Sequence, residues 1–100
     1  MAPFAWRRWW SRNGLPALRI LAIEHWDPLG VYDDPPNAHV YDLYLDRVGR
    51  MLRRGKGPDD IARYLGDVRT KALKREPSEI ADEVFADRVV AWYAIEAPEA

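Results

Sequence analysis

Residues 41–58 read YDLYLDRVGRMLRRGKGP, and this stretch decides the fold. Its apolar side chains recur at steps of three and four, the spacing that places them on one face of an α-helix. They are Tyr41, Tyr44, Leu45, Val48 and Leu52. The glycines and proline of residues 55–58 stop a helix, and Asn37 is an eligible N-cap. We therefore expect a helix from Asn37 or Ala38 to Arg54, followed by a tight turn.

Two further helices are expected after this turn. Pro58 and the acids that follow it are typical of a first helical turn, so a helix should run from there to about Leu73. Its predicted core face is Ile61, Leu65, Val68 and Ala72. Pro77 ends this helix, and Ser78 can cap a last one through about Ile95. The predicted core face of the last helix is Ala81, Val84, Phe85, Val89 and Trp92.

Upstream of the deciding stretch, a helix over residues 15–25 has an apolar stripe at Leu18, Leu21 and Ala22. A long proline-rich loop follows over residues 26–36. Residues 1–14 form an N-terminal arm in which tryptophans alternate with arginines, and Asn13–Gly14 signals a turn or helix stop at its end. We expect the tryptophan side of this arm to pack over Tyr93 and Ile95, or on a second copy of the chain in a homodimer.

The predicted fold is an all-α bundle of about four helices, with residues 15–100 as a single domain behind the arm of residues 1–14. Residues 89–95 are also rich in residues that favour β-strands, but no second candidate strand exists to pair with them.

Composition excludes several classes of function. The chain has no cysteine, which rules out disulfides, thiolate zinc sites and cysteine nucleophiles. Neither His25 nor His39 has a recognisable nucleophile nearby, and no glycine-rich phosphate loop occurs. We therefore expect a protein that is not an enzyme and needs no cofactor. Charged residues interrupt the apolar run after Leu15, so we expect no transmembrane segment or signal peptide and a cytoplasmic location.

The net charge of −1 hides four blocks of alternating sign. Residues 1–23 carry a net charge of +4, residues 24–49 carry −5, residues 50–75 carry +6 and residues 76–100 carry −6. Such alternation indicates oppositely charged helices that lie side by side, or a block that faces a charged partner.

Residues 26–31, read WDPLGV, and residues 41–44, read YDLY, resemble a family of short, uncharacterised bacterial helical proteins. The family pattern is W-D-P-I-G-V, an acidic or proline-containing loop, D-E-Y-D-x-Y and a basic, glycine-ended helix. The resemblance extends over roughly residues 20–95, and here His39–Val40 stands where the pattern has D-E. It implies a helical fold and an accessory or immunity-type protein rather than an enzyme.

The acidic and aromatic residues of this region form the predicted site for a partner protein, because aromatic side chains carry much of the energy of interfaces. The residues are Trp26, Asp27, Asp33, Asp34, His39, Tyr41, Asp42 and Asp46. In the alternative interpretation, aromatic packing clamps the loop on the bundle and Asp27 accepts backbone N–H groups across the turn. His39, Asp42 and Asp46 also share the spacing i, i+3 and i+7, so a metal site is a less favoured hypothesis.

The alternative function is nucleic-acid binding through the basic block, since a helix, a glycine-rich turn and a second helix occur there in order. The candidate residues are Arg50, Arg53, Arg54, Lys56, Arg63, Arg69, Lys71, Lys74 and Arg75. The computed isoelectric point of about 6.1 weakens this hypothesis, as do Asp59, Asp60 and Asp67, which would face the same phosphates.

Overall fold

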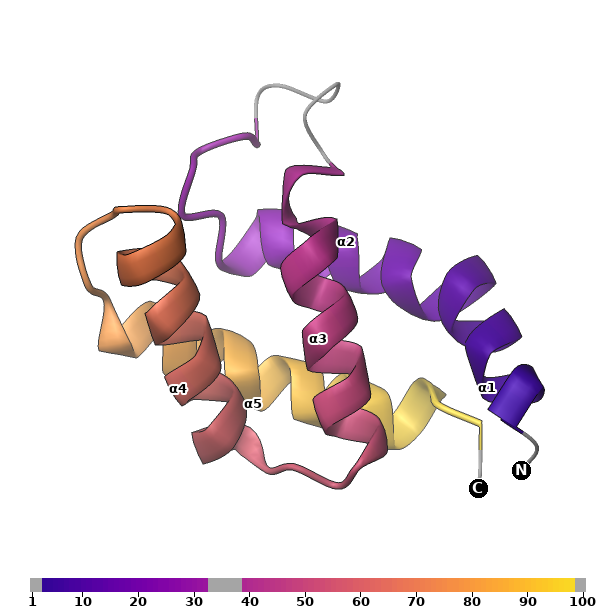
Figure 1. Ribbon diagram of the computed structural model, residues 1–100. Coiled ribbons are helices and arrows are strands. Elements are labelled where there is room, and N and C mark those ends of the chain that lie inside the picture. The colour runs from indigo at the N-terminus through magenta and orange to yellow at the C-terminus, as the bar shows by residue number, and fades with distance from the viewer. Residues whose placement is uncertain (1–2, 33–38, 99–100) are drawn as a thin grey trace.

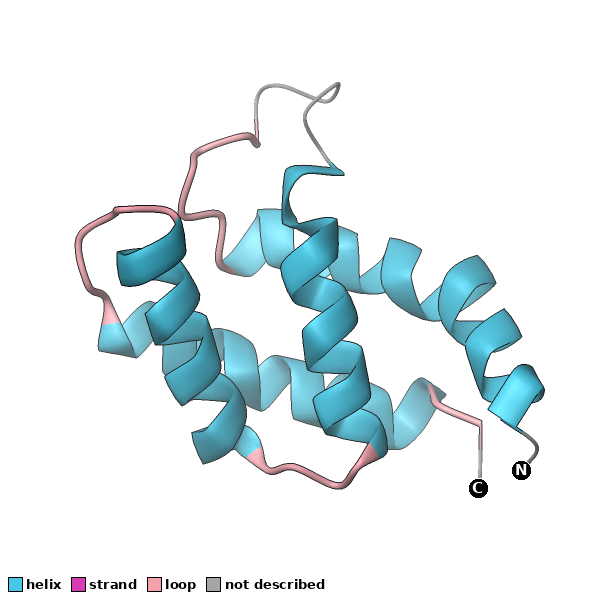
Figure 2. Ribbon diagram, viewed as in Figure 1, coloured by secondary structure: helices cyan, strands magenta, loops and turns pink. Residues whose placement is uncertain are grey.

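The computed structural model describes residues 3–32 and 39–98, which fold into four helical stretches joined by loops (Figure 1). Every regular element within these ranges is helical, and no strand occurs in them (Figure 2). The elements in chain order are α1 (Pro3–Trp9), η1 (Trp10–Gly14), α2 (Leu15–His25), α3 (Asp42–Arg53), α4 (Pro58–Asp67), η3 (Val68–Ala72) and α5 (Glu79–Glu96). The predicted all-α bundle is confirmed, and the strand alternative for residues 89–95 is wrong because α5 covers them.

The first three elements form one unbroken helical stretch, so the predicted break at Asn13–Gly14 is wrong. Gly14 has right-handed helical angles, φ −65° and ψ −57°. The Leu15 N–H donates to the Trp10 carbonyl, five residues back, which is the hydrogen bond of a π-helix. A Cβ atom at Gly14 would lie 2.6 Å from the Trp10 ring. The glycine therefore makes room for a tryptophan and does not stop the helix.

The tryptophans of α1 and η1 belong to the core. Trp6 and Trp10 are buried and stack with their ring centroids 5.5 Å apart. The Trp6 indole donates to the Tyr93 hydroxyl over 2.8 Å, which holds α1 beside the C-terminal end of α5 (Figure 1). The predicted cover over Tyr93 is confirmed, whereas Ile95 stays 79% exposed. The tryptophan side is thus used within the chain and is not available to pair two arms.

Trp10 also fixes the first helical stretch to α3. Its indole N–H donates to the Asp46 carboxylate over 2.8 Å. The neighbouring Gly49 is buried against the same ring, and a Cβ atom there would lie 2.6 Å from two ring carbons. The absence of a side chain at Gly49 is what allows the indole to lie against the α3 backbone.

The elements α3, α4, η3 and α5 bury most of the residues predicted to form their core faces, namely Leu45, Val48, Leu52, Ile61, Leu65, Val68, Phe85 and Val89. Ala72 and Val84 are exposed instead, so the predictions for these two are wrong. The Leu73 N–H donates to the Val68 carbonyl over 2.9 Å, so η3 is π-helical and has more residues per turn than an α-helix. This change of period turns Ala72 away from the core, whereas Arg69, four residues after Leu65, stays on the buried side of the helix. Val84 lies on the outer side of α5, away from the buried Phe85, Ala86 and Val89.

Among the described residues, no helix combines the length and the apolar character needed to cross a membrane.

Candidate functional site

The predicted partner-binding patch around Trp26 and Tyr41 is interior. Trp26 is 6% exposed, stacks on Phe85 with a centroid distance of 5.6 Å, and donates its indole N–H to Asp82 over 2.8 Å. Tyr41 is fully buried. The prediction that these two side chains contact a partner is therefore wrong. Their packing follows the alternative interpretation, in which aromatic side chains clamp the loop on the bundle.

Asp27 holds together the turn that follows α2. Its carboxylate accepts the backbone N–H groups of Val31 and Tyr32, each over 2.9 Å, and the Tyr41 hydroxyl over 2.7 Å. Burial, and after it the hydrogen bond to Asp27, raises the pKa of Tyr41, so this hydroxyl stays protonated. The predicted role of Asp27 as an acceptor across the turn is confirmed, and both of its oxygens are occupied within the chain.

The acids of α3 are also engaged internally. Arg19 donates from Nε and Nη2 to the two oxygens of Asp42, over 3.0 and 2.8 Å, and the exposed His39 lies 3.3 Å from the same carboxylate. Partial burial acts to raise the pKa of Asp42, but the hydrogen bonds and charges of Arg19 and His39 outweigh it and lower that pKa. Asp46 accepts the Trp10 indole N–H. These carboxylates stabilise the fold. Among the predicted partner-binding residues that the structure describes, His39 is the exposed one.

Two predicted partner-binding residues, Asp33 and Asp34, lie outside the described residues. The metal hypothesis finds no support in the rest: residues 3–32 and 39–98 contain no group of three or more His, Cys, Asp or Glu side chains that could hold a metal ion. Asp42 is directed to Arg19 and Asp46 to Trp10, so the set at i, i+3 and i+7 does not converge.

Arg69 does not belong to a nucleic-acid-binding surface. It is 7% exposed, and its Nε donates to the Asp82 carboxylate over 3.0 Å. Its guanidinium also lies 5.9 Å from the centre of the Trp26 ring. Arg69 lies four residues after the buried Leu65, so helical spacing places it on the same side of the helix, and the prediction that it contacts nucleic acid is wrong.

The other predicted basic residues lie on several surfaces. The Arg53 guanidinium lies over the Trp6 ring at 4.8 Å, on the side of α3 that faces α1. Lys71 forms an exposed ion pair with Asp67 over 3.3 Å. Two more, Lys74 and Arg75, are exposed in the connection between η3 and α5. The basic block is therefore not one continuous patch.

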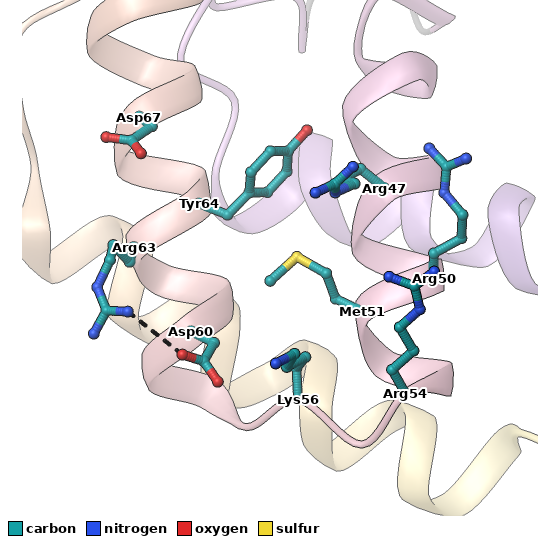
Figure 3. Close-up of a pocket in the computed structure, with 9 residues that line it drawn as sticks. All are labelled: Arg47, Arg50, Met51, Arg54, Lys56, Asp60, Arg63, Tyr64 and Asp67. Atoms are coloured by element: carbon teal, nitrogen blue, oxygen red, sulfur yellow. Dashed lines mark hydrogen bonds and ion pairs between the residues drawn. The ribbon is translucent and has the colours of Figure 1, made fainter.

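Four of the predicted cations do come together, in a groove between α3 and α4 that we call the α3/α4 groove (Figure 3). They are Arg50, Arg54, Lys56 and Arg63. The groove has a volume of about 400 Å³, and its lining is completed by Arg47, Met51, Asp60, Tyr64 and Asp67. Figure 3 shows Arg47 and Arg50 on α3 and Arg54 directly after its end, while on α4 Tyr64 points toward Arg47 and Arg63 toward Asp60.

A tight turn joins the two helices that line the groove. Gly55 has a φ of +80°, a conformation that glycine adopts without strain. Its N–H donates to the Leu52 carbonyl and the Lys56 N–H to the Met51 carbonyl, both over 3.0 Å, which is the glycine-ended cap of an α-helix. Pro58 then begins α4. The two helices are thus held side by side, with Lys56 at the end of the groove (Figure 3).

The lining of the α3/α4 groove has an excess of positive charge. Its five cations and two carboxylates give a net charge of +3. The carboxylates already have cationic partners, since Asp60 lies 3.4 Å from Arg63 and Asp67 lies 3.3 Å from Lys71. The other four cations form no ion pair with any residue that the structure describes: Arg47, Arg50, Arg54 and Lys56. They can accept an anionic ligand without breaking an existing pair.

Between the charged edges lie the half-buried side chains of Met51 and Tyr64. Burial raises the pKa of Tyr64 against the opposing charges of Arg47 and Arg50, and Tyr44 adds to the rise. The Tyr64 hydroxyl therefore stays protonated at neutral pH and can donate a hydrogen bond. The groove thus offers an anion several guanidinium groups, a phenol donor and an apolar surface.

Sequence reasoning missed three residues of the groove: Arg47, Met51 and Tyr64. For Arg47 a signal existed, because it lies three residues before Arg50 and seven before Arg54, on the same helix face. The signal was missed because Arg47 lies in the acidic block of residues 24–49, whereas Arg50 and Arg54 lie in the basic block of residues 50–75. Met51 and Tyr64 line the same groove only because of how α3 and α4 are arranged in the fold. The sequence around either residue does not predict this arrangement.

Comparison of the chain with protein-family models, with curated proteins and with solved structures yields no match. The function has to be inferred from the chemistry of the α3/α4 groove.

Proposed function

We propose that this chain is a non-enzymatic interaction module that binds an acidic segment of a partner protein in the α3/α4 groove. The observation that carries the proposal is the set of four cations without ion-pair partners in the described chain, gathered around Met51 and Tyr64. Guanidinium groups form strong, charge-assisted hydrogen bonds with carboxylates. Arginine, tyrosine and methionine are also enriched in protein interfaces. The groove combines the two kinds of contact that an acidic, partly apolar segment needs.

The arrangement along α3 suggests the spacing of the acids in the partner. Arg47, Arg50 and Arg54 cover seven residue steps, or about 10 Å of helix at 1.5 Å per residue. A helical segment with carboxylates at i, i+3 and i+7 matches this length. An apolar side chain between those carboxylates would meet Met51 and Tyr64.

A nucleic-acid ligand is the second candidate, because a row of exposed arginines can also follow phosphates. The carboxylates on the α4 side of the groove disfavour a nucleic-acid ligand. Asp60 and Asp67 line the groove opposite the arginines, where a phosphate backbone would add further negative charge. A protein segment can place an amide or a cation there. The slightly acidic chain, with a net charge of −1, also attracts a polyanion less than a basic domain does.

A binding role also agrees with the chemistry of the lining. None of the nine lining side chains is a histidine, serine or cysteine, so the groove has no pairing of a nucleophile with a base of the usual kinds. An accessory or immunity-type protein, as the family resemblance implies, holds a partner and does not transform a substrate. A module with a basic groove suits that role.

The test is fluorescence anisotropy with a labelled helical peptide that carries glutamates at i, i+3 and i+7 and leucines between them. We expect Arg50→Glu and Arg54→Glu each to weaken binding at least about tenfold, since each change removes a charged partner and adds a repulsion. Arg75→Glu makes the same change of charge outside the groove and should bind as the wild type does. All three residues are exposed, so circular dichroism should show an unchanged fold.

Two results would contradict the proposal. In the first, the peptide binds equally well to the wild type and to both groove variants. In the second, duplex DNA binds more tightly than the peptide, with a steep dependence on salt that Arg75→Glu also reduces. The second result would favour a nucleic-acid-binding module.

A further inference from the structure

α5 carries an apolar stripe on the side that faces away from the core. Its buried residues Phe85, Ala86 and Val89 face the bundle. On the opposite side lie five exposed apolar residues: Ile80, Val84, Ala91, Ala94 and Ile95. Ile80 and Ile95 are 77% and 79% exposed, which is high for isoleucine. We call these five residues the α5 stripe.

The core-facing side of α5 is covered by the chain itself. Its most extensive contact is with α4, and it also packs on α2. Near its C-terminal end, Tyr93 meets Trp6 and Trp92 stacks on Trp9. In Figure 1, α5 lies behind α3 and α4, and the α5 stripe shares no residue with the α3/α4 groove. The stripe is therefore a separate surface that no described part of the chain covers.

Four of the five stripe residues have the spacing of a short coiled-coil seam, and Ile95 lies beside it at an e position. Apolar residues at heptad positions a and d form such a seam. Ile80 and Ala94 take d positions, and Val84 and Ala91 take a positions. The remaining d position, midway along the seam, is the exposed Asp87. Two heptads of this pattern fit within the 18 residues of α5.

Charged residues flank the seam in a complementary order. Glu83 takes the g position before Val84, and Arg88 takes the e position after Asp87. All three charged residues are exposed, and none forms an ion pair with another residue in the described ranges. Charges at e and g decide which helix a seam accepts and in which orientation.

We propose that two copies of this chain associate reversibly through the α5 stripe, with their α5 helices parallel. In a parallel pair, position g of one helix faces position e of the other, so Glu83 meets the partner's Arg88 on both sides of the seam. The same arginine borders the partner's Asp87 and compensates its charge. An antiparallel pair would instead bring Arg88 against the partner's Arg88 and Glu83 against the partner's Glu83. The charges thus select a second copy in one orientation.

The size of the stripe determines the strength of the association. A standard stable interface buries about 1,600 Å² in total, and contacts below about 1,200 Å² are weak and transient. Two heptads with two alanines and one aspartate belong to the weak class, because a polar core position fixes register at the expense of stability. We therefore expect monomer and dimer to exchange, with the dimer fraction rising as the concentration increases.

Sedimentation velocity over a range from micromolar to millimolar concentrations tests the association. We expect Ile80→Asp to leave only monomer, and Ala94→Leu to tighten the dimer at least about tenfold, since a larger d residue buries more apolar area. Arg88→Glu should weaken the dimer, and the double variant Glu83→Arg/Arg88→Glu should restore it. These positions are exposed, so circular dichroism should report an unchanged fold.

The orientation is tested by cross-linking, because the chain has no cysteine of its own. A parallel seam places Ala94 next to the partner's Ala94, so Ala94→Cys should oxidise to a covalent dimer at least about tenfold faster than the exposed control Ala72→Cys. Equal rates for the two cysteine variants would overturn the proposal. So would a wild type that stays monomeric at all concentrations, or a dimer that survives Ile80→Asp.

Discussion

The substitution Asp82→Ala should lower the free energy of unfolding strongly, although it removes only a small side chain. Asp82 is 4% exposed, and one of its oxygens accepts both the Arg69 Nε over 3.0 Å and the Trp26 indole N–H over 2.8 Å. The buried Arg69 Nη2 has no hydrogen-bond partner in the described chain, so Asp82 is the main compensation for that guanidinium charge. Alanine would leave a buried cation and a buried donor without a partner.

The magnitude follows from these contacts. Removing one partner of a buried ion pair lowers the free energy of unfolding by about 3–5 kcal/mol. A buried donor that loses its acceptor, here the Trp26 indole N–H, adds about 1–3 kcal/mol. Since the two effects overlap at one carboxylate, we expect a loss of roughly 4–6 kcal/mol, comparable to the whole stability of many small domains.

Urea denaturation, followed by circular dichroism and tryptophan fluorescence, measures this loss. The control is Arg69→Met/Asp82→Leu, which removes both charges and should return the free energy of unfolding to within about 2 kcal/mol of the wild type. Glu83→Ala, at the neighbouring exposed acid, should change it by less than about 0.5 kcal/mol. If Asp82→Ala loses less than about 1.5 kcal/mol, the buried pair is not the element that holds α5 to η3, and the reasoning is refuted.

Three further predictions test other parts of the fold. Gly49→Ala should lower the free energy of unfolding by about 1–2 kcal/mol in urea denaturation, because the new Cβ meets the Trp10 ring at 2.6 Å and the gain in helix propensity offsets only part of that overlap; a more stable variant would contradict this. Tyr41→Phe should lower it by about 1–3 kcal/mol, since Asp27 loses a buried donor, and an unchanged midpoint would argue against the clamp. The lowered pKa of Asp42 means that its stabilisation is complete above the pKa of the unfolded state, near about 4, and is lost as the pH falls through the folded-state pKa. The free energy of unfolding of Asp42→Asn should therefore fall less steeply with acid than that of the wild type, and parallel curves would show that Asp42 is not the group responsible.

Helices whose apolar residues recur regularly were predictable from the sequence. The pattern from Tyr41 to Leu52 predicted the buried face of α3, and the glycine and proline after it predicted its end and the turn. The predicted start at Asn37 or Ala38 lies outside the described residues, and α3 itself begins at Asp42. These signals are local, because they depend on helix periodicity and on backbone conformations that one or two residues dictate. The basic groove was partly predictable for the same reason, since most of its cations belong to one charge block.

The errors arose where distant residues decide the structure. Trp26 is buried because its indole meets Asp82, 56 residues away, and no pattern around Trp26 shows that partner. Glycine often ends a helix, but Gly14 lies inside one and leaves space for the Trp10 ring. The sequence does not distinguish these two roles of glycine. Arg69 shares the helical spacing of Ile61 and Leu65, but its charge suggested an exposed position, and the acid that pairs with it, Asp82, lies 13 residues away in α5.

The hydrogen bond between Trp6 and Tyr93 joins residues separated by 87 positions, nearly the length of the chain. During translation the tryptophans of α1 therefore emerge long before α5, which completes their burial, has been made. Until then a nascent chain exposes a cluster of indoles beside arginines, the kind of surface that molecular chaperones bind and that promotes aggregation. A chain without Trp92 and Tyr93 should therefore lack the α5 partners of Trp6 and Trp9 and keep only the contacts that α3 makes with Trp6 and Trp10.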